Sequence, residues 1–189
     1  MKTQVLLLLL TAILLVNCQA DKKESKASAE VPQDPIQMER LYYEISIDAT
    51  PMVVYQVITG KATFEKWTAE FSPISTYEGS WDQGTEMKFI STMEDGSTAG
   101  MISLVRENRP NEYIGLTHIG MIQNGEEIRE GPEIDIMKGA EENYSILPDG
   151  EGALLKIDTH TYADYKSYFE ETWPKGLAVI KEMAESQNN

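Results

Sequence analysis

The chain has 189 residues and a formal net charge of −15, because 31 Asp and Glu outnumber 16 Lys and Arg. Nucleic-acid phosphates require clusters of Lys and Arg, so this acidic composition argues against a nucleic-acid partner and against electrostatic docking on anionic lipid. The sequence contains a single cysteine, so the folded domain has no intramolecular disulfide.

The N-terminal segment, MKTQVLLLLLTAILLVNC, predicts a bacterial lipoprotein signal peptide. A lysine precedes the apolar run Val5–Val16, which has the length of a secretory signal core and is shorter than a membrane-spanning helix of about 20 residues. LVNC resembles the lipobox of bacterial lipoproteins, although Asn17 stands where Gly, Ala or Ser is usual. The alternative is an ordinary secretory peptide in which Cys18 is incidental.

This interpretation divides the chain into three regions: a signal peptide at 1–17, a lipidated flexible tether at 18–39 and a folded domain at 40–187. The tether is rich in Lys, Glu, Ser, Ala and Pro and has no apolar period. Acyl chains on Cys18, palmitate among them, would anchor the protein to a membrane of the bacterial cell envelope, on its periplasmic or surface face.

The folded domain is expected to open with a strand and two short helices. Residues 41–47, LYYEISI, alternate as a half-buried strand does. Thr50 suits the N-cap of a first helix, which Gly60 should end, and a second short helix is expected from near Thr63.

A series of antiparallel strands should follow, separated by turns rich in Gly, Pro, Asn and Asp, at 74–79, 85–92, 98–107, 112–120, 140–147 and 153–161. The acidic residues 121–139 interrupt this series and are expected to form a long loop that could include a helical turn.

The C-terminus predicts a long helix with one apolar stripe, formed by Tyr165, Phe169, Trp173, Leu177, Ile180 and Ala184. Pro174 lies inside this stripe, so the helix should kink or restart there, with Thr172 as the new cap. One curved antiparallel sheet with this helix along its concave face satisfies the order of elements.

Several strings resemble the SRPBCC (START-like) superfamily over about residues 40–187, and the nearest branch resembles activators of the heat-shock protein 90 ATPase. They are DATPMVVYQVIT, FEKWTAEFSP, YEGSWDQGTEMKF, VRENRPNEYIGLTHIG, AEENYSILPDGEGALLKID and YFEETWPKGLAVIKEMAE. The resemblance implies an α+β helix-grip fold, with about six to seven strands around a long C-terminal helix and two short helices after the first strand. It leaves the function open, since this fold serves carriers, cyclases and chaperone activators.

A helix-grip fold implies a cavity between the helix and the concave sheet face, and the 121–139 loop should hang over one end of it. Strand parity predicts ligand contacts at Leu116 and His118, and the helix stripe predicts them at Phe169, Trp173 and Leu177. The segment that contains Trp67 and Phe71 should close the other end of the cavity and contact the ligand too. Other aromatic and methionine side chains that could line it are Trp81, Phe89, Tyr113, Tyr144, Met87, Met93, Met101 and Met121.

The sequence predicts neither a metal site nor a cofactor. The only histidines, His118 and His160, lie on separate predicted strands and lack the spacing of a metal-ligand pair. No G-x-S-x-G, H-E-x-x-H or glycine-rich phosphate string occurs either.

We expect a non-enzymatic, lipid-anchored envelope protein whose domain binds a small hydrophobic or amphipathic molecule. Two alternatives stay open at this point. One is a cyclase or hydrolase in which His118 acts as acid or base; the other is an interaction module resembling a chaperone regulator, which the export signal opposes.

Overall fold

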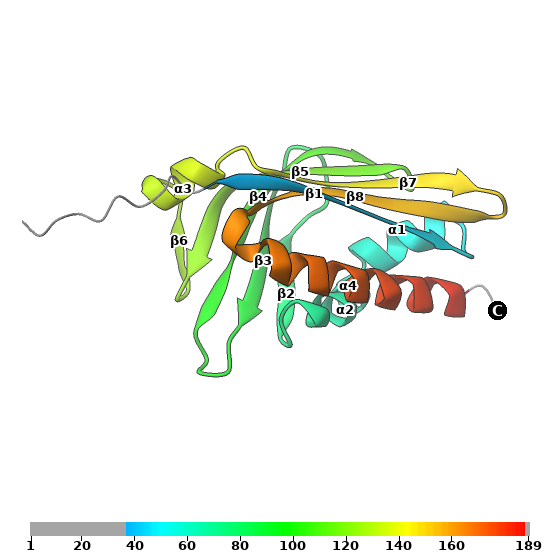
Figure 1. The fold of residues 1–189 in the computed structure, drawn as a ribbon, viewed down its shortest axis with the longest axis horizontal. Helices are drawn as coiled ribbons and strands as arrows, with labels where there is room; N and C mark the ends of the chain where they lie inside the picture. Colours follow the sequence, from blue (N-terminus) through cyan, green and yellow to red (C-terminus); the bar gives the residue numbers. More distant parts are fainter. Residues whose placement is uncertain (1–36, 188–189) are drawn as a thin grey trace, which may run out of the picture. The chain divides into compact units, whose positions relative to one another are not determined.

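An antiparallel eight-stranded sheet and a long C-terminal helix dominate the computed structural model (Figure 1). The structure describes residues 37–187, so the predicted signal peptide, Cys18 and most of the predicted tether lie outside the described residues. The elements are β1 (Met38–Ile47), α1 (Pro51–Thr59), α2 (Lys61–Trp67), the 3₁₀ turn η1 (Thr68–Glu70), β2 (Ser75–Gly79), β3 (Glu86–Thr92), β4 (Thr98–Arg109), β5 (Tyr113–Gln123), β6 (Glu126–Ile128), α3 (Pro132–Met137), β7 (Glu141–Asp149), β8 (Gly152–Tyr162), the 3₁₀ turn η2 (Ala163–Tyr165) and α4 (Lys166–Ser186).

The strand order across the sheet is β1-β8-β7-β5-β4-β3-β2, and β6 pairs with the end of β5. The expected helix-grip architecture and its six internal strands are confirmed within a few residues at each boundary. The turns form where the sequence predicts them: Gly96 and Asn111 both have positive φ, and the N–H of Glu112 donates to the carbonyl of Arg109 at 3.0 Å.

Two irregularities bend the central β4–β5 pair. The register shifts between Ile102 and Ser103, where β5 carries an extra residue, and again between Val105 and Glu107. Bulges of this kind bend a strand and increase its twist. Figure 1 shows the hairpin of β3 and β4 extending downward, away from the β1, β7 and β8 part of the sheet.

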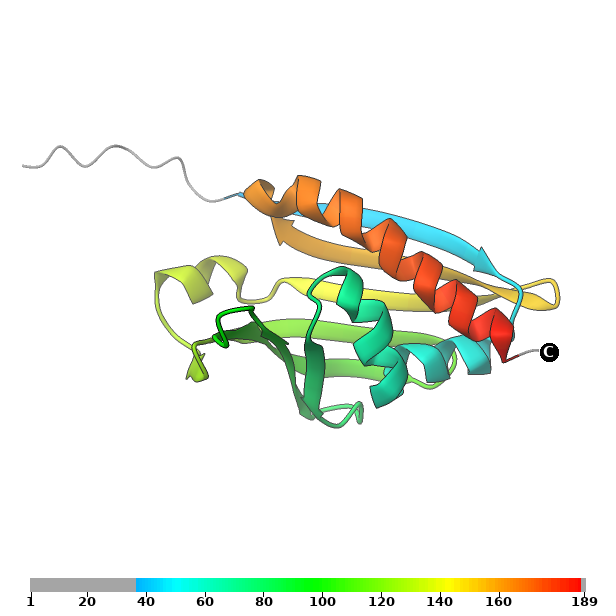
Figure 2. The same ribbon diagram turned by 90° about the horizontal axis from the view of Figure 1, so that it is seen from below.

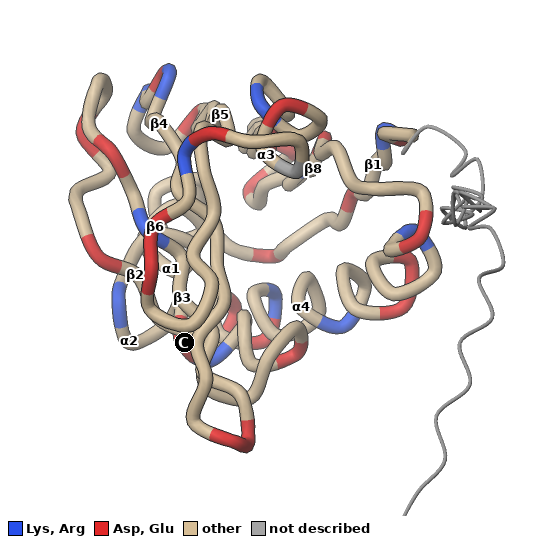
Figure 3. Tube along the Cα trace, turned by 90° about the vertical axis from the view of Figure 1, so that its left-hand side faces the viewer, with Lys and Arg blue, Asp and Glu red and all other residues tan. Residues whose placement is uncertain are grey.

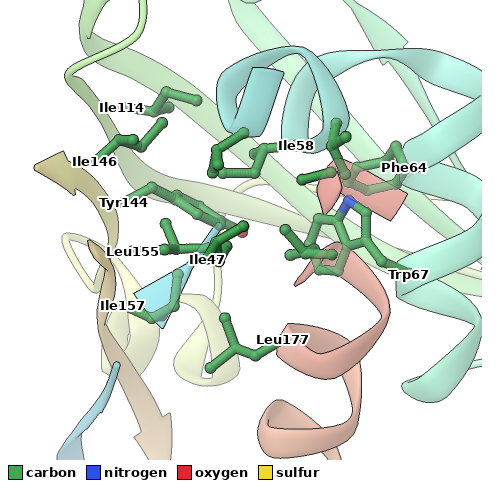
Figure 4. Packing of buried hydrophobic residues seen from close by; sticks show 14 of the residues in the cluster. Ile47, Ile58, Phe64, Trp67, Ile114, Tyr144, Ile146, Leu155, Ile157 and Leu177 are labelled. Atoms are coloured by element: carbon green, nitrogen blue, oxygen red, sulfur yellow. The ribbon is translucent and has the colours of Figure 1, made fainter. Parts of the chain in front are cut away.

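Helix α4 crosses one face of the sheet diagonally, with α1 and α2 beside it (Figure 2). Its predicted stripe is buried at Trp173, Leu177, Ile180 and Ala184. On the sheet, the hydrophobic cluster beneath α1 and the C-terminal half of α4 includes Ile47, Ile146 and Leu155, and it closes on Ile58 of α1 (Figure 4).

Helix α4 does not restart at Pro174 as the sequence predicts. The helix is continuous from Lys166 to Ser186, and Thr172 is an interior residue whose hydroxyl donates to the carbonyl of Tyr168 at 2.9 Å. Tertiary packing of the buried stripe holds the helix together through a residue that lacks an N–H.

Four smaller expectations also need correction. Thr50 occupies the N-cap of α1 but its side chain makes no capping hydrogen bond, and α2 begins at Lys61, before Thr63. The predicted loop at 121–139 is more ordered than expected, because β5 extends to Gln123, β6 pairs back onto it and α3 follows. β1 begins at Met38, inside the range assigned to the tether.

Candidate functional site

A cavity of about 380 Å³ lies between the sheet and the N-terminal half of α4. Its walls come from β1, α2, η1, β3, β4, β5, β7, β8, α3 and α4. Figure 3 views the molecule from the end where α3 and the start of β1 lie, and shows acidic and basic residues on the surrounding elements.

The cavity arises because the inward faces of the strands change character along their length. On β8 the inward residues Ala153, Leu155 and Ile157 belong to the core, whereas the next ones, Thr159 and Thr161, border the cavity. Smaller and more polar side chains at this end leave space that aliphatic side chains fill at the other.

The inward-facing residues of the neighbouring strands and of α4 also change from core residues to cavity-lining residues along each element. Ala140, just before β7, and Glu142 on β7 border the cavity, and Tyr144 separates them from Ile146 in the core. α1 packs against the core end of β7 and β8, whereas α3 packs against β5 and its Met137 borders the cavity.

Aromatic rings form one wall of the cavity, with Trp173 at its centre. Its ring centroid lies 5.0 Å from that of Phe71, and 6.2 Å from those of Trp67 and Tyr144. Phe71 in turn lies 6.3 Å from Phe169, one turn earlier on α4. Such contacts add packing energy beyond buried area and create a flat apolar surface.

Polar groups are concentrated on the sheet side of the cavity, on β7 and β8. The Tyr144 hydroxyl donates a short hydrogen bond to the Glu142 carboxyl, which borders the cavity beside Thr159 in the β7–β8 register. Thr161 of β8 also borders the cavity. These groups are available to a bound molecule.

Burial governs the ionisation of the Glu142–Tyr144 pair. Desolvation raises the pKa of Glu142, and the hydrogen bond from Tyr144 acts in the opposite direction. Desolvation and the neighbouring carboxyl raise the pKa of Tyr144, so its hydroxyl stays protonated and donates. The described residues form no ion pair with Glu142.

His118 borders the cavity from β5, where its Nδ1 lies 2.8 Å from the Oγ of Ser103 on β4. Burial, with a smaller effect of His160, lowers the pKa of His118 to about 4, so the ring is neutral near pH 7. Ser103 itself is fully buried and does not border the cavity, so its hydroxyl cannot serve as a nucleophile for a molecule bound there.

Five of the seven predicted contact residues border the cavity: Trp67, Phe71, His118, Phe169 and Trp173. The other two, Leu116 and Leu177, lie in the hydrophobic core and not at the cavity. Each is closer than the cavity-lining residue of its own element to the end that α1 covers. The cavity is bordered at once by the sheet, α4, the α2–η1 segment and α3 from the 121–139 segment, as predicted.

Of the other aromatic and methionine side chains expected to line the cavity, some border it and some do not. Phe89, Tyr144 and Met101 border the cavity, whereas Trp81, Tyr113, Met87, Met93 and Met121 do not. Trp81 instead packs on Phe64 and Phe89, and the Tyr113 hydroxyl donates to Asn143.

Glu142 is the cavity residue of greatest chemical interest that sequence analysis did not identify. Its signal is strand parity: in AEENYSI the inward series is Ala140, Glu142, Tyr144 and Ile146, so a carboxyl stands where an apolar side chain is expected. His160 also borders the cavity, and its Nδ1 accepts a hydrogen bond from the N–H of Glu141 at 3.1 Å.

Two further observations bear on function. Across residues 37–187, no group of three or more His, Cys, Asp and Glu side chains is arranged to hold a metal ion. None of the helices in this part of the chain has both the length and the apolar character needed to cross a membrane.

Comparison with known proteins supports the fold. The family model described as "Activator of Hsp90 ATPase homolog 1-like protein" matches residues 48–185, well over half of the chain. No curated protein matches.

Solved structures provide more distant similarities. The Mll3558 protein from Rhizobium loti is 14% identical with a TM-score of 0.61, over 79% of this chain and 99% of that one. Protein NE0264 from Nitrosomonas europaea is 12% identical with a TM-score of 0.60, over 79% and 96%. The Aha1 dimer from Colwellia psychrerythraea is 20% identical with a TM-score of 0.55, over 78% and 96%. At these identities the likeness shows the fold alone.

Proposed function

The chain belongs to the Activator of Hsp90 ATPase homolog 1-like family, and from this premise we propose that it is a lipid-anchored protein of the bacterial cell envelope whose START-like domain binds a small hydrophobic or amphipathic molecule. The observation that carries the proposal is the cavity of about 380 Å³ between α4 and the sheet.

The character of the cavity supports a small-molecule ligand. Its volume falls within the range of about 300–1,000 Å³ that is usual for such sites, and an apolar wall with a few polar groups is typical of them. Trp67, Phe71 and Trp173 supply the apolar surface, and Glu142 and His118 supply polar groups.

The proposed anchor rests on the sequence. The apolar run Val5–Val16 followed by LVNC is the pattern of a lipoprotein signal, and acyl chains on Cys18 would hold the domain at a membrane. The domain would then act at the end of a tether of Lys, Glu, Ser, Ala and Pro.

A second candidate is an enzyme that uses His118 as acid or base. One observation favours it: the ring borders the cavity and has a polar partner, Ser103. Ser103 is closed off behind the ring, so His118 would have to act on a bound molecule without a serine nucleophile.

The third candidate, a chaperone-regulator-like module, rests on the description of the family and on the Aha1 similarity. The predicted export signal opposes it, because cytoplasmic ATP-dependent chaperones are not available outside the inner membrane. Stoichiometric co-purification of a chaperone would favour this candidate.

Uptake of an apolar fluorescent probe tests the leading proposal. Ala140→Phe should abolish uptake, because Ala140 borders the cavity and the larger ring would occupy it. Leu147→Phe is the matched control, since Leu147 lies on β7, the strand that directly follows Ala140, but is 44% exposed and does not border the cavity. Mass spectrometry of a solvent extract from the purified protein should also reveal a bound apolar molecule.

Two results would contradict the proposal. One is a wild-type protein that neither carries an extractable molecule nor takes up the probe. The other is undiminished uptake by an Ala140→Phe variant that still melts cooperatively, which would place the probe elsewhere on the molecule.

A further inference from the structure

The Glu142 carboxyl points to the chemistry of the ligand's polar end. It borders an otherwise aromatic cavity, and its hydrogen-bond partner within the described chain is the hydroxyl of Tyr144. No lysine or arginine is among the described residues that border the cavity. A carboxyl placed there ionises against a desolvation penalty, which the hydrogen bond from Tyr144 offsets in part and no Lys or Arg among the described residues at the cavity offsets further.

We infer that the cavity takes an amphiphilic amine, a molecule with an apolar body and a protonated nitrogen that pairs with the Glu142 carboxylate. This inference rests on the proposed binding function and specifies its ligand class. An ammonium group would supply the missing counter-charge and would donate to the carboxylate as Tyr144 already does.

The aromatic wall favours the same ligand class. Trp67, Trp173 and Phe71 surround the space with ring faces and edges, and cations are attracted to aromatic faces within about 6 Å of the ring centroid. The same rings bury the apolar body, so both parts of an amphiphilic amine find complementary surface.

The arrangement disfavours an acidic amphiphile such as a fatty acid. Its carboxylate would meet Glu142 in a space that no described Lys or Arg borders, and two like charges in an apolar site repel strongly. The overall charge of −15 adds repulsion to the approach of an anion.

The other titratable groups at the cavity do not replace the missing cation. Burial keeps His118 neutral near pH 7, and Nδ1 of His160 accepts a hydrogen bond from the backbone N–H of Glu141. The remaining groups bordering the cavity are the hydroxyls of Tyr144, Tyr162 and Tyr165.

Three probes with the same alkyl chain test the inference: decylamine, decanol and decanoate. Their dissociation constants would be measured on the purified full chain at pH 7, through the fluorescence of the cavity tryptophans. We expect decylamine to bind tightest and decanoate weakest. Glu142→Gln should weaken decylamine by about 10- to 100-fold, the value of a charge-assisted hydrogen bond, while leaving decanol unchanged.

Glu141→Gln provides the matched control. Glu141 precedes Glu142 on β7 but lies on the other face of the strand, where it pairs with Arg106 at 3.5 Å. The same chemical change there should leave all three dissociation constants as they are.

The outcomes separate this inference from the proposed function. If decanol and decylamine bind equally, or if Glu142→Gln does not change their ratio, binding stands and the amine inference is overturned. Decanoate binding as tightly as decylamine would overturn it too. If none of the probes binds to the wild-type chain, both proposals fall.

Discussion

Trp173 is the residue on which the helix, the sheet and the cavity wall depend most. It is 3% exposed, and its ring contacts those of Tyr43, Trp67, Phe71 and Tyr144. Trp173→Ala should lower the free energy of unfolding by about 3–5 kcal/mol, because it empties the centre of this cluster. Denaturant unfolding monitored by circular dichroism would measure the loss.

Trp173→Phe is the natural comparison. The indole N–H of Trp173 is buried without a hydrogen-bond partner among the described atoms, so replacing the indole by a phenyl ring loses packing volume but no hydrogen bond. It should therefore be clearly milder than Trp173→Ala. Equal losses for the two variants would contradict the proposed packing role.

His118 should make stability depend on pH. Its pKa is about 4 in the folded protein and near the ordinary 6.5 when unfolded, so the unfolded chain binds more protons between these values. Stability from this group is complete above about pH 6.5 and is lost as the pH falls to about 4, by up to roughly 3 kcal/mol. Urea unfolding of the wild type and of His118→Gln across this range would measure it.

Glu142 makes stability depend on pH in the opposite direction. The informative quantity is therefore the difference in the free energy of unfolding between the wild type and His118→Gln. Its folded pKa is raised, so its contribution is present below pH 4.5 and is lost as the pH rises through the raised value. Both proteins contain Glu142, and their difference isolates His118. Stability curves that run parallel from pH 4 to 6.5 would show that the histidine does not titrate as argued.

At the scale of elements, α4 contains a proline at an interior position, where proline is unfavourable for a helix. Pro174 is exposed in the middle of the helix, where proline costs about 3 kcal/mol relative to alanine. Pro174→Ala also loosens the unfolded chain, which offsets up to about 1 kcal/mol. We expect a net gain of about 2 kcal/mol in calorimetry or denaturant unfolding. No gain would mean that the ring makes a compensating contact.

Gly176 sets how closely α4 approaches the α2–η1 segment. A Cβ at this position would lie 2.8 Å from Cε2 of Phe71 and 3.5 Å from the carbonyl oxygen of Trp67. Gly176→Ala should therefore destabilise by about 1–2 kcal/mol, although alanine favours the helix by about 1 kcal/mol. Thermal melts of Gly176→Ala with and without Phe71→Leu test this, and the double variant should recover part of the loss.

The segment 121–139 shows why some elements escape sequence analysis. This acidic, glycine-containing segment shows no periodic pattern of apolar residues. Even so, β6 pairs with β5, and Met137 of α3 borders the cavity. The strand forms because β5 offers an unpaired edge beyond the end of β7, and the edge is a property of the assembled sheet. Its order could not be predicted from residues 121–139 alone.

For the whole molecule, we expect Cys18 to decide location without affecting the fold. Cys18→Ala removes the only thiol that could be acylated, and Cys18 lies outside residues 37–187, the part of the chain that the structure describes. The variant should leave the membrane fraction while keeping the melting temperature of the domain. Fractionation of cells followed by thermal melts checks both parts, and continued membrane association of Cys18→Ala would contradict the lipoprotein interpretation.

The sequence by itself determined the order and type of nearly all elements of the domain. Strand alternation, turn residues such as Gly96 and Asn111, and the stripe on α4 are local signals, because they reflect which side of a strand or helix is buried. The same signals predicted that His118 and Trp173 face one cavity, since parity and the helix stripe select the buried face of each element.

Only the tertiary structure decided where along that face the core ends and the cavity begins. Leu116 and His118 share a strand and a parity, but α1 packs over the end that holds Leu116, and the other end is left to α3 and the start of α4. Likewise, a glutamate at position 142 gains its interest only when the sheet places it at a cavity that Trp67 and Trp173 border and that no Lys or Arg of residues 37–187 borders. The periodicity of apolar residues indicates which positions are buried. Packing between segments distant in the sequence determines which of those positions border a cavity.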